Sequence, residues 1–289
     1  MHVRDLLSGD QPTFSFEFFP PRDLAAAQTL RLSMKELVPL APSFVSITYG
    51  AGGSTRQLTH DLVLQVHQTE RLHVVPHLTC VGSSRAELRE ALARYAAAGI
   101  EDIMALRGDP PAGQPGFTPA TDGFPHAADL VAFIRQEFPG FGVGVAGYPH
   151  GHPETPNRLR EMDHLKAKVD AGADYICTQL FFDNHVFYDF CDRCEAAGVR
   201  VPIIAGIMPI TSMATMRRMS ELALGVHIPG KLQNAFGRMS ERGSVARIGV
   251  HWAAEQVRDL MDHHVAGIHL YTLNQSRATL QIVETLGVL

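Results

Sequence analysis

Charged side chains follow apolar, strand-like runs at two places in this sequence. Arg107, Gly108 and Asp109 come directly after the run 103–106, and the two prolines behind them cannot continue a sheet. Glu17 stands near the end of a run at 13–19 in which phenylalanines alternate with other residues. A carboxylate held partly out of water has a raised pKa and can donate a proton near neutral pH. These residues indicate acid–base chemistry at strand ends. A local ion pair at a turn, or Glu17 bound to an inward cation, would also explain them.

Glycines and single polar residues mark other strand ends. The segment 50–53 contains three glycines, which let a backbone approach a ligand, and Ser54 or Thr55 can cap the helix that follows. His77 lies inside a predicted strand, where a lone histidine is more often structural than ligand-binding. Gln179 is expected at the centre of another strand. A buried amide needs hydrogen-bond partners and suits a heterocyclic amide ligand.

A helix predicted over 158–171 has two distinct faces. Glu161, His164 and Lys168 recur at spacings of three and four, so they share one face. This face is either solvated or holds a sugar and a phosphate. The apolar stripe of the same helix comprises Met162, Leu165 and Val169.

Eight strand-like runs alternate with helical segments. A glycine preceded by alanine ends helical runs at Gly99, Gly172, Gly198 and Gly267, which predicts a left-handed helix-to-strand turn at each. Such units predict a parallel α/β protein, and eight strands favour a (β/α)8 TIM barrel over an open doubly wound sheet, with the active site at the carboxyl ends of the strands. Helices at about 211–222 and 244–263 are extra and would add a wall or a contact in a homo-oligomer. The strands are predicted at 13–19, 43–49, 74–80, 102–107, 142–148, 175–181, 202–208 and 267–273.

Three motifs suggest other chemistry but fit poorly. Glycines at 142, 144 and 147 match G-x-G-x-x-G, yet they run through a strand instead of opening a helix. His150, His152 and Glu154 could bind a metal, but a loop over a bound ligand is favoured because a catalytic metal site needs a further ligand and an open position. The C-x-x-C pair at 191 and 194 lies in a predicted helix, which indicates reduced thiols.

Composition limits the remaining classes of function. The 289 residues are 45% hydrophobic and 19% charged, and no linker divides them, so residues 1–289 are expected to form one domain. A net charge of −5 excludes a basic surface for nucleic acid or anionic membranes. With no membrane-spanning run, no leading signal peptide and only four cysteines, a cytoplasmic protein is expected.

Six ordered motifs resemble the bacterial methylenetetrahydrofolate reductases across nearly the whole chain. The resemblance implies a βα barrel that binds FAD without a Rossmann motif. It also implies that NADH or NADPH reduces the flavin and leaves, and that methylenetetrahydrofolate then takes the hydride to become methyltetrahydrofolate, which feeds methionine synthesis. The motifs are FSFEFFPPR (14–22), SITYG (46–50), PHLTC (76–80), LRGDPP (106–111), TQLFFD (178–183) and YTLN (271–274).

The resemblance also assigns roles to residues. Glu17 is the expected general acid that opens the methylene bridge to an iminium, and Asp109 the carboxylate beside the flavin ring. Thr48, Gln179, Thr215 and Gln275 are expected on the substrate side. Residues expected to hold FAD are Tyr49, Ala51, His77, Arg107, Gly108, Asp109, Ala127, Tyr148, His152, Glu161, His164 and Lys168.

The sequence departs from the family pattern on the substrate side. Gln275 replaces a usual arginine, and Thr215 and Met219 stand where relatives carry glutamine and phenylalanine. These positions concern how the folate tail and the nicotinamide are held. A barrel that binds flavin or folate without turnover is the alternative function, and the presence of both Glu17 and Asp109 favours the enzyme. A metal-dependent barrel hydrolase is a more distant alternative.

Overall fold

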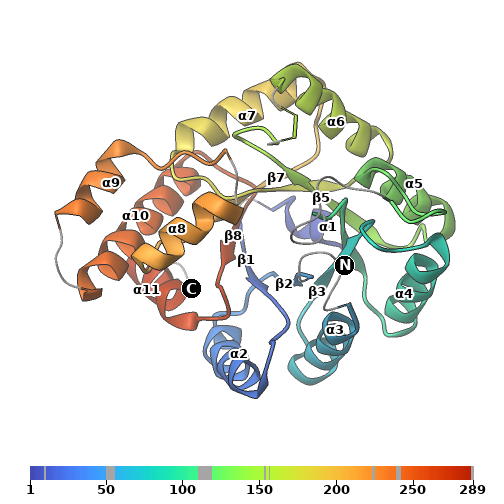
Figure 1. Ribbon diagram of the computed structural model, residues 1–289, viewed down its shortest axis with the longest axis horizontal. Helices are drawn as coiled ribbons and strands as arrows, with labels where there is room; N and C mark the ends of the chain where they lie inside the picture. The colour runs from blue at the N-terminus through green and yellow to red at the C-terminus, as the bar shows by residue number, and fades with distance from the viewer. Residues whose placement is uncertain are drawn as a thin grey trace.

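Eight parallel strands close into a barrel in the computed structural model, in the order β1 to β8 (Figure 1). The structure describes residues 1–9, 11–49, 56–109, 119–152, 154–155, 157–222, 225–238 and 242–287. The strands are β1 (Thr13–Phe18), β2 (Phe44–Ile47), β3 (Val74–Thr79), β4 (Asp102–Leu106), β5 (Gly142–Gly147), β6 (Tyr175–Thr178), β7 (Ile203–Ile207) and β8 (Gly267–Tyr271). The helices are α1 (Val3–Leu6), α2 (Leu24–Leu37), α3 (Arg56–Glu70), α4 (Arg85–Ala97), α5 (Ala127–Glu137), α6 (Arg158–Asp170), α7 (Asn184–Ala196), α8 (Met213–Leu222), α9 (Gly230–Gly237), α10 (Arg242–Asp262) and α11 (Ser276–Leu286), with a short 3-10 helix, η1 (Val38–Leu40).

Closure of the sheet confirms the predicted TIM barrel. β1 pairs in parallel with β2 on one side and with β8 on the other, so the sheet has no free edge. The doubly wound alternative is therefore wrong. Every predicted strand is present, although β2, β6 and β8 end two or three residues earlier than predicted.

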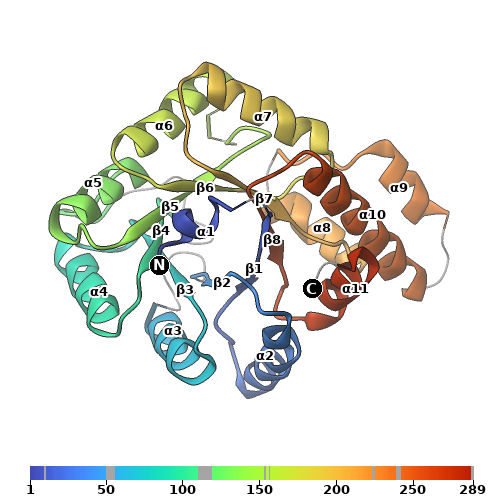
Figure 2. The same ribbon diagram turned by 180° about the vertical axis from the view of Figure 1, so that it is seen from behind.

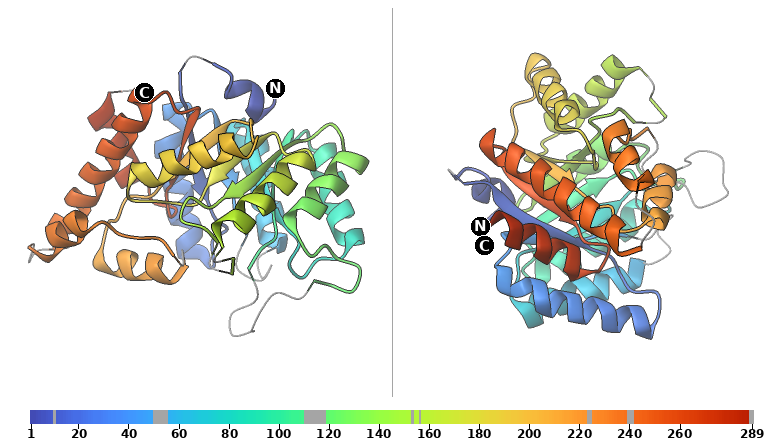
Figure 3. Two further views of the ribbon diagram at one scale, coloured as in Figure 1. Left: turned by 90° about the horizontal axis from the view of Figure 1, so that it is seen from above. Right: turned by 90° about the vertical axis from the view of Figure 1, so that its left-hand side faces the viewer.

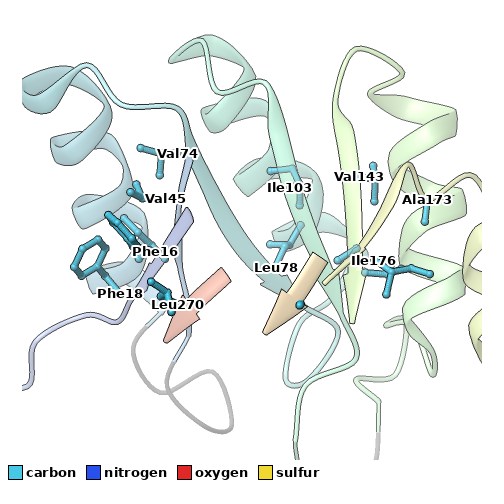
Figure 4. Packing of buried hydrophobic residues seen from close by; sticks show 14 of the residues in the cluster. Phe16, Phe18, Val45, Val74, Leu78, Ile103, Val143, Ala173, Ile176 and Leu270 are labelled. Atoms are coloured by element: carbon cyan, nitrogen blue, oxygen red, sulfur yellow. The ribbon is translucent and has the colours of Figure 1, made fainter. Parts of the chain in front are cut away.

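The main hydrophobic core lies between the barrel and its surrounding helices (Figure 4). Strand alternation sends Phe16 and Phe18 outward, where they join Leu30 and Met34 of α2 in that core. Burying one such side chain stabilises the fold by about 1.5–3 kcal/mol. The intervening Glu17 is thereby turned toward the barrel interior.

The repeated glycine turn is confirmed at three of its four predicted positions. Gly99, Gly172 and Gly198 have φ values of +82°, +114° and +77°, which only glycine adopts cheaply. The prediction is wrong for Gly267, which begins β8. His264, with φ of +55°, takes the left-handed position after α10 instead. Gly267 is needed for another reason, because a Cβ there would collide with the Thr13 side chain.

The glycines of β5 serve packing and not nucleotide binding. A Cβ at Gly142 would collide with Asp102, and one at Gly144 with the ring of Tyr175. These two positions of the strand therefore need glycine because side chains of the neighbouring strands β4 and β6 fill the space beside them. The predicted helical position of the C-x-x-C pair is also confirmed, because Cys191 and Cys194 lie on α7.

The two ends of the barrel are covered differently. At the amino ends of the strands, α1 lies across the barrel, and the backbone N–H of Val3 donates to the buried Asp102 carboxylate (3.2 Å to each oxygen; Figure 2). The added helices α8, α9 and α10 pack around a second hydrophobic cluster beside β6 and β7. Of these, α9 was not predicted. In Figure 3 (left), α8 lies at the opposite end of the molecule from α1. No helix in the described ranges is long and apolar enough to cross a membrane.

Candidate active site

A cavity of about 610 Å³ opens among the carboxyl ends of the strands. Residues expected at the site from six strand ends and two helices converge on it, although they are spread over more than half of the chain. Those that line it are Glu17, Thr48, His77, Arg107, Gly108, Asp109, Ala127, Tyr148, His152, Glu161, His164, Lys168 and Gln179.

The carboxylate of Glu17 lies within a polar cluster in the barrel interior. Its Oε2 is 3.5 Å from His77 Nε2, 3.8 Å from His269 Nε2 and 3.5 Å from Ser46 Oγ. Ser46 Oγ and Ser15 Oγ also lie 3.1 Å and 2.7 Å from the two ring nitrogens of His269. The phenylalanines next to Glu17 in sequence face the helices, so the apolar contacts expected for this carboxylate are replaced by polar ones.

His77 has an unusual environment for a structural histidine. Burial lowers its pKa, and the nearby Glu17 carboxylate partly opposes that shift. Its Nε2 faces Glu17, whereas its Nδ1 is buried with no hydrogen-bond partner in the described structure. Because buried polar atoms are usually satisfied, this atom marks a place where a ligand can bind.

A second wall of the cavity comes from α6 and the end of β5. Lys168 donates to the carbonyl oxygen of Ala146 (2.6 Å) and lies over the ring of Tyr148 at 5.9 Å. Burial lowers the pKa of Lys168 to about 8, and burial raises the pKa of the neighbouring Glu161. The exposed His164 continues this wall and stacks on His126. The predicted helical face thus lines the cavity.

The first turn of α5 borders the same wall. Ala127, Ala128 and Asp129 line the cavity, and a helix N-terminus presents backbone N–H groups and a partial positive charge. Together with Lys168, this turn can hold an anionic group.

The segment after β5 is fixed across the end of β4. Arg107 donates to Glu154 at 2.6 Å, and the ring of His152 meets that of Tyr148 edge-on at 4.8 Å. Glu154 is thereby used in an ion pair. In the described part of the chain no three His, Cys, Asp or Glu side chains are grouped to hold a metal ion.

Some predicted site residues lie elsewhere. The Tyr49 hydroxyl lies 3.4 Å from His60 Nε2, and the hydroxyl oxygens of Thr215 and Ser212 are 2.8 Å apart. Gln275 is exposed and directly precedes α11. None of the three lines the cavity, and Ala51 is outside the described residues. Gln179 lies just past the end of β6, half-buried, so its expected place at the centre of the strand is wrong.

Several lining residues were missed. His269 and Tyr271 alternate with Ile268 and Leu270 along β8, and this period of two was a usable signal for inward side chains. Cys177 faces the cavity for the same reason. His126 and Asp129 gave no such signal, because only the fold brings the start of α5 to the cavity.

The fold and the site define a βα-barrel protein with a ligand cavity at the carboxyl ends of its strands. Among solved structures, an uncharacterized Clostridium thermocellum protein that binds two copies of 5-methyl-5,6,7,8-tetrahydrofolic acid has the same fold, with a TM-score of 0.67 and 15% identity over 98% of this chain and 96% of that one. Oxaloacetate acetylhydrolase is more distant, with a TM-score of 0.53 and 11% identity over 98% of this chain and 81% of that one.

Sequence comparison identifies the family. The family model for methylenetetrahydrofolate reductase matches residues 2–287. The chain is 38% identical to 5,10-methylenetetrahydrofolate reductase of Pectobacterium carotovorum, over 95% of this chain and 90% of that protein. It is 37% identical to methylenetetrahydrofolate reductase (NADH) 1 of Arabidopsis thaliana, over 99% of this chain but 50% of that protein. The chain belongs to the methylenetetrahydrofolate reductase family. It spans about half the length of the plant and yeast relatives.

Proposed function

We propose that this chain reduces 5,10-methylenetetrahydrofolate to 5-methyltetrahydrofolate with NADH or NADPH, using FAD as its cofactor. The family membership gives the reaction class. The observation that carries the proposal is the carboxylate of Glu17, which lines the cavity beside His77 and His269.

The reaction needs both a hydride and a proton. Opening the N–CH2–N bridge breaks one carbon–nitrogen bond; the carbon gains a hydride to become a methyl group, and the released nitrogen gains a proton. Glu17, in its protonated form, is the donor that we assign to that nitrogen. Its side chain is 19% exposed and so reaches the cavity. Proton donation by a positioned side chain typically accelerates a reaction by about 100-fold to 10,000-fold.

The lining residues suit a flavin dinucleotide. Lys168 and the first turn of α5 would hold the pyrophosphate, and the unpartnered Nδ1 of His77 offers a hydrogen-bonding atom to the ligand. When bound, FAD would accept a hydride from the nicotinamide and deliver it to the folate. Asp109 is exposed at the cavity and would disfavour negative charge on a ligand beside it.

Separate half-reactions test the proposal. The purified protein is loaded with FAD under anaerobic conditions, mixed with NADH or NADPH, and then mixed with methylenetetrahydrofolate while the flavin absorbance is followed. Bleaching and then reoxidation are expected for the wild type. Glu17→Gln should retain bleaching within about twofold and slow reoxidation by at least about 100-fold, because only the second step needs the proton.

The controls separate the alternatives. Glu101→Gln is a matched variant, since Glu101 is exposed at the opposite end of the barrel, and it should leave both steps unchanged. A wild-type flavin that is never reoxidised by the folate would contradict the proposed reaction and favour a binding protein. Equal loss of both steps in Glu17→Gln would contradict the role of this carboxylate.

A further inference from the structure

The sequence 271–274, Tyr-Thr-Leu-Asn, makes contacts that the proposed chemistry does not explain. β8 ends at Tyr271, which is the last residue in register with β1, opposite Glu17. Beyond this point the regular ladder between the two strands stops. On the side that faces β8, the backbone polar groups of Glu17 and Phe19 would therefore lack partners unless other groups supplied them.

Side chains continue the ladder where the backbone stops. Thr272 Oγ1 donates to the backbone carbonyl oxygen of Glu17 at 2.6 Å. Asn274 uses both ends of its amide on Phe19: its Oδ1 accepts from the Phe19 N–H at 3.0 Å and its Nδ2 donates to the Phe19 carbonyl at 2.8 Å. This pair of bonds copies the donor and acceptor that a neighbouring strand would present. We call Thr272 and Asn274 the β8 clamp.

The clamp is buried and locally strained. Thr272 and Asn274 are only 5% and 4% exposed. Leu273 and Asn274 have φ values of +52° and +58°, a left-handed conformation that asparagine tolerates and leucine disfavours. Three hydrogen bonds hold the turn: the Asn274 N–H donates to Thr272 Oγ1 at 3.1 Å, the Gln275 N–H donates to the Thr272 carbonyl at 3.0 Å, and Ser33 Oγ on α2 donates to the Asn274 carbonyl at 2.8 Å. Strain that persists inside such a network points to a functional constraint.

The other side of β1 is held by ordinary backbone bonding. The N–H of Thr48, after β2, donates to the Phe18 carbonyl at 3.0 Å. The β8 clamp supplies the hydrogen bonds on the side of β1 that faces β8, so the backbone of β1 around Glu17 is held from both neighbouring strands. From this geometry we infer that Thr272 and Asn274 are positioning residues, which hold the Glu17 carboxylate where it donates its proton. The assignment rests on the proposed function.

Isosteric variants test the clamp. Thr272→Val keeps the shape of the side chain and removes both the donor to the Glu17 carbonyl and the acceptor of the Asn274 N–H, and Thr272→Ser restores both. Asn274→Gly removes the amide and keeps a residue that tolerates the left-handed conformation. In the FAD-loaded protein, Thr272→Val and Asn274→Gly should slow flavin reoxidation by the folate about tenfold or more, because misplacement of a reacting group is costly. Flavin reduction by NADH should stay within about twofold, and Thr272→Ser should recover reoxidation.

A readout that needs no turnover accompanies these rates. Hydrogen exchange of the peptide that contains Phe19 should speed up in Thr272→Val and Asn274→Gly, and remain at the wild-type rate in peptides from β3 to β5. If both half-reactions slow equally, or exchange near Phe19 does not change, the clamp is not a positioning device. If the wild type fails to transfer hydride to the folate, the proposed function fails, while the exchange data still decide whether the clamp holds β1.

Discussion

Lys168 is expected to weaken the fold while it prepares the cavity for an anion. Burial lowers the pKa of this side chain from its usual 10.5 to about 8. At about 1.4 kcal/mol for each pH unit, keeping the buried group charged at neutral pH costs about 3 kcal/mol. Lys168→Met also leaves the Ala146 carbonyl and the buried Glu161 without this cation, which offsets about 1–2 kcal/mol of that cost. Lys168→Met, which keeps the apolar stem, should therefore raise the free energy of unfolding by about 1–2 kcal/mol at pH 7.

Because burial lowers the pKa of Lys168, this residue makes the free energy of unfolding depend on pH. In the unfolded chain Lys168 keeps its proton up to about pH 10, whereas the folded protein releases it near pH 8. Between these values the unfolded state binds more protons, so the free energy of unfolding rises with pH. The wild type should gain stability from this residue between pH 8 and pH 10, and Lys168→Met should lack that contribution.

Urea unfolding, followed by circular dichroism at pH 7, 8, 9 and 10 without added flavin or phosphate, measures both effects. Lys166→Met is the matched control, because Lys166 lies on the same helix with a side chain 43% exposed, and it should change stability little. FAD should bind Lys168→Met more weakly than the control. If Lys168→Met is less stable than the wild type at pH 7, or shows the same rise above pH 8, the burial argument is refuted.

Two further predictions concern stability alone. Burial lowers the pKa of His60 to about 4, so below pH 6.5 the unfolded chain binds a proton at this residue that the folded protein does not bind. The free energy of unfolding, measured by urea titration, should therefore fall by about 3 kcal/mol between pH 6.5 and pH 4. The fall should be smaller in His60→Gln. Gly144→Ala would force a methyl group into the buried Tyr175 ring and should cost about 1–3 kcal/mol in thermal unfolding, whereas Gly140→Ala, which meets no atom within 4 Å, should be nearly neutral. A neutral Gly144→Ala, or a flat response of the wild type to acid, would contradict these readings.

The barrel could be predicted because its signals are local and repeated. Each strand carries its own apolar run, and turns such as that at Gly99 carry their own glycine. Gly267 shows the limit of this reasoning. Its neighbours in sequence suggest a turn, but its role is set by Thr13, on the strand that pairs with β8 only when the barrel closes.

The surroundings of Glu17 could not be predicted for the same reason. Alternation within β1 places the carboxylate inside, but its partners depend on the register between strands. Ser46, on β2, lies opposite Glu17, and His269, on β8, lies opposite Ser15. The alternation of buried and inward-facing residues excludes a shift of one residue, but a shift of two would keep these side chains inward and change which of them meet, and a single sequence does not exclude that.

The three residues that depart from the family pattern lie outside the cavity lining. Gln275 is exposed before α11, Thr215 pairs with Ser212, and Met219 is buried in the second hydrophobic cluster. Since none of them lines the cavity, their identities do not alter the groups around Glu17 and Lys168. The roles expected for Gln275 and Thr215 in substrate binding remain predictions. If those roles hold, they concern parts of the substrate that extend beyond the cavity, and substitutions there should change KM for the folate more than the rate of hydride transfer.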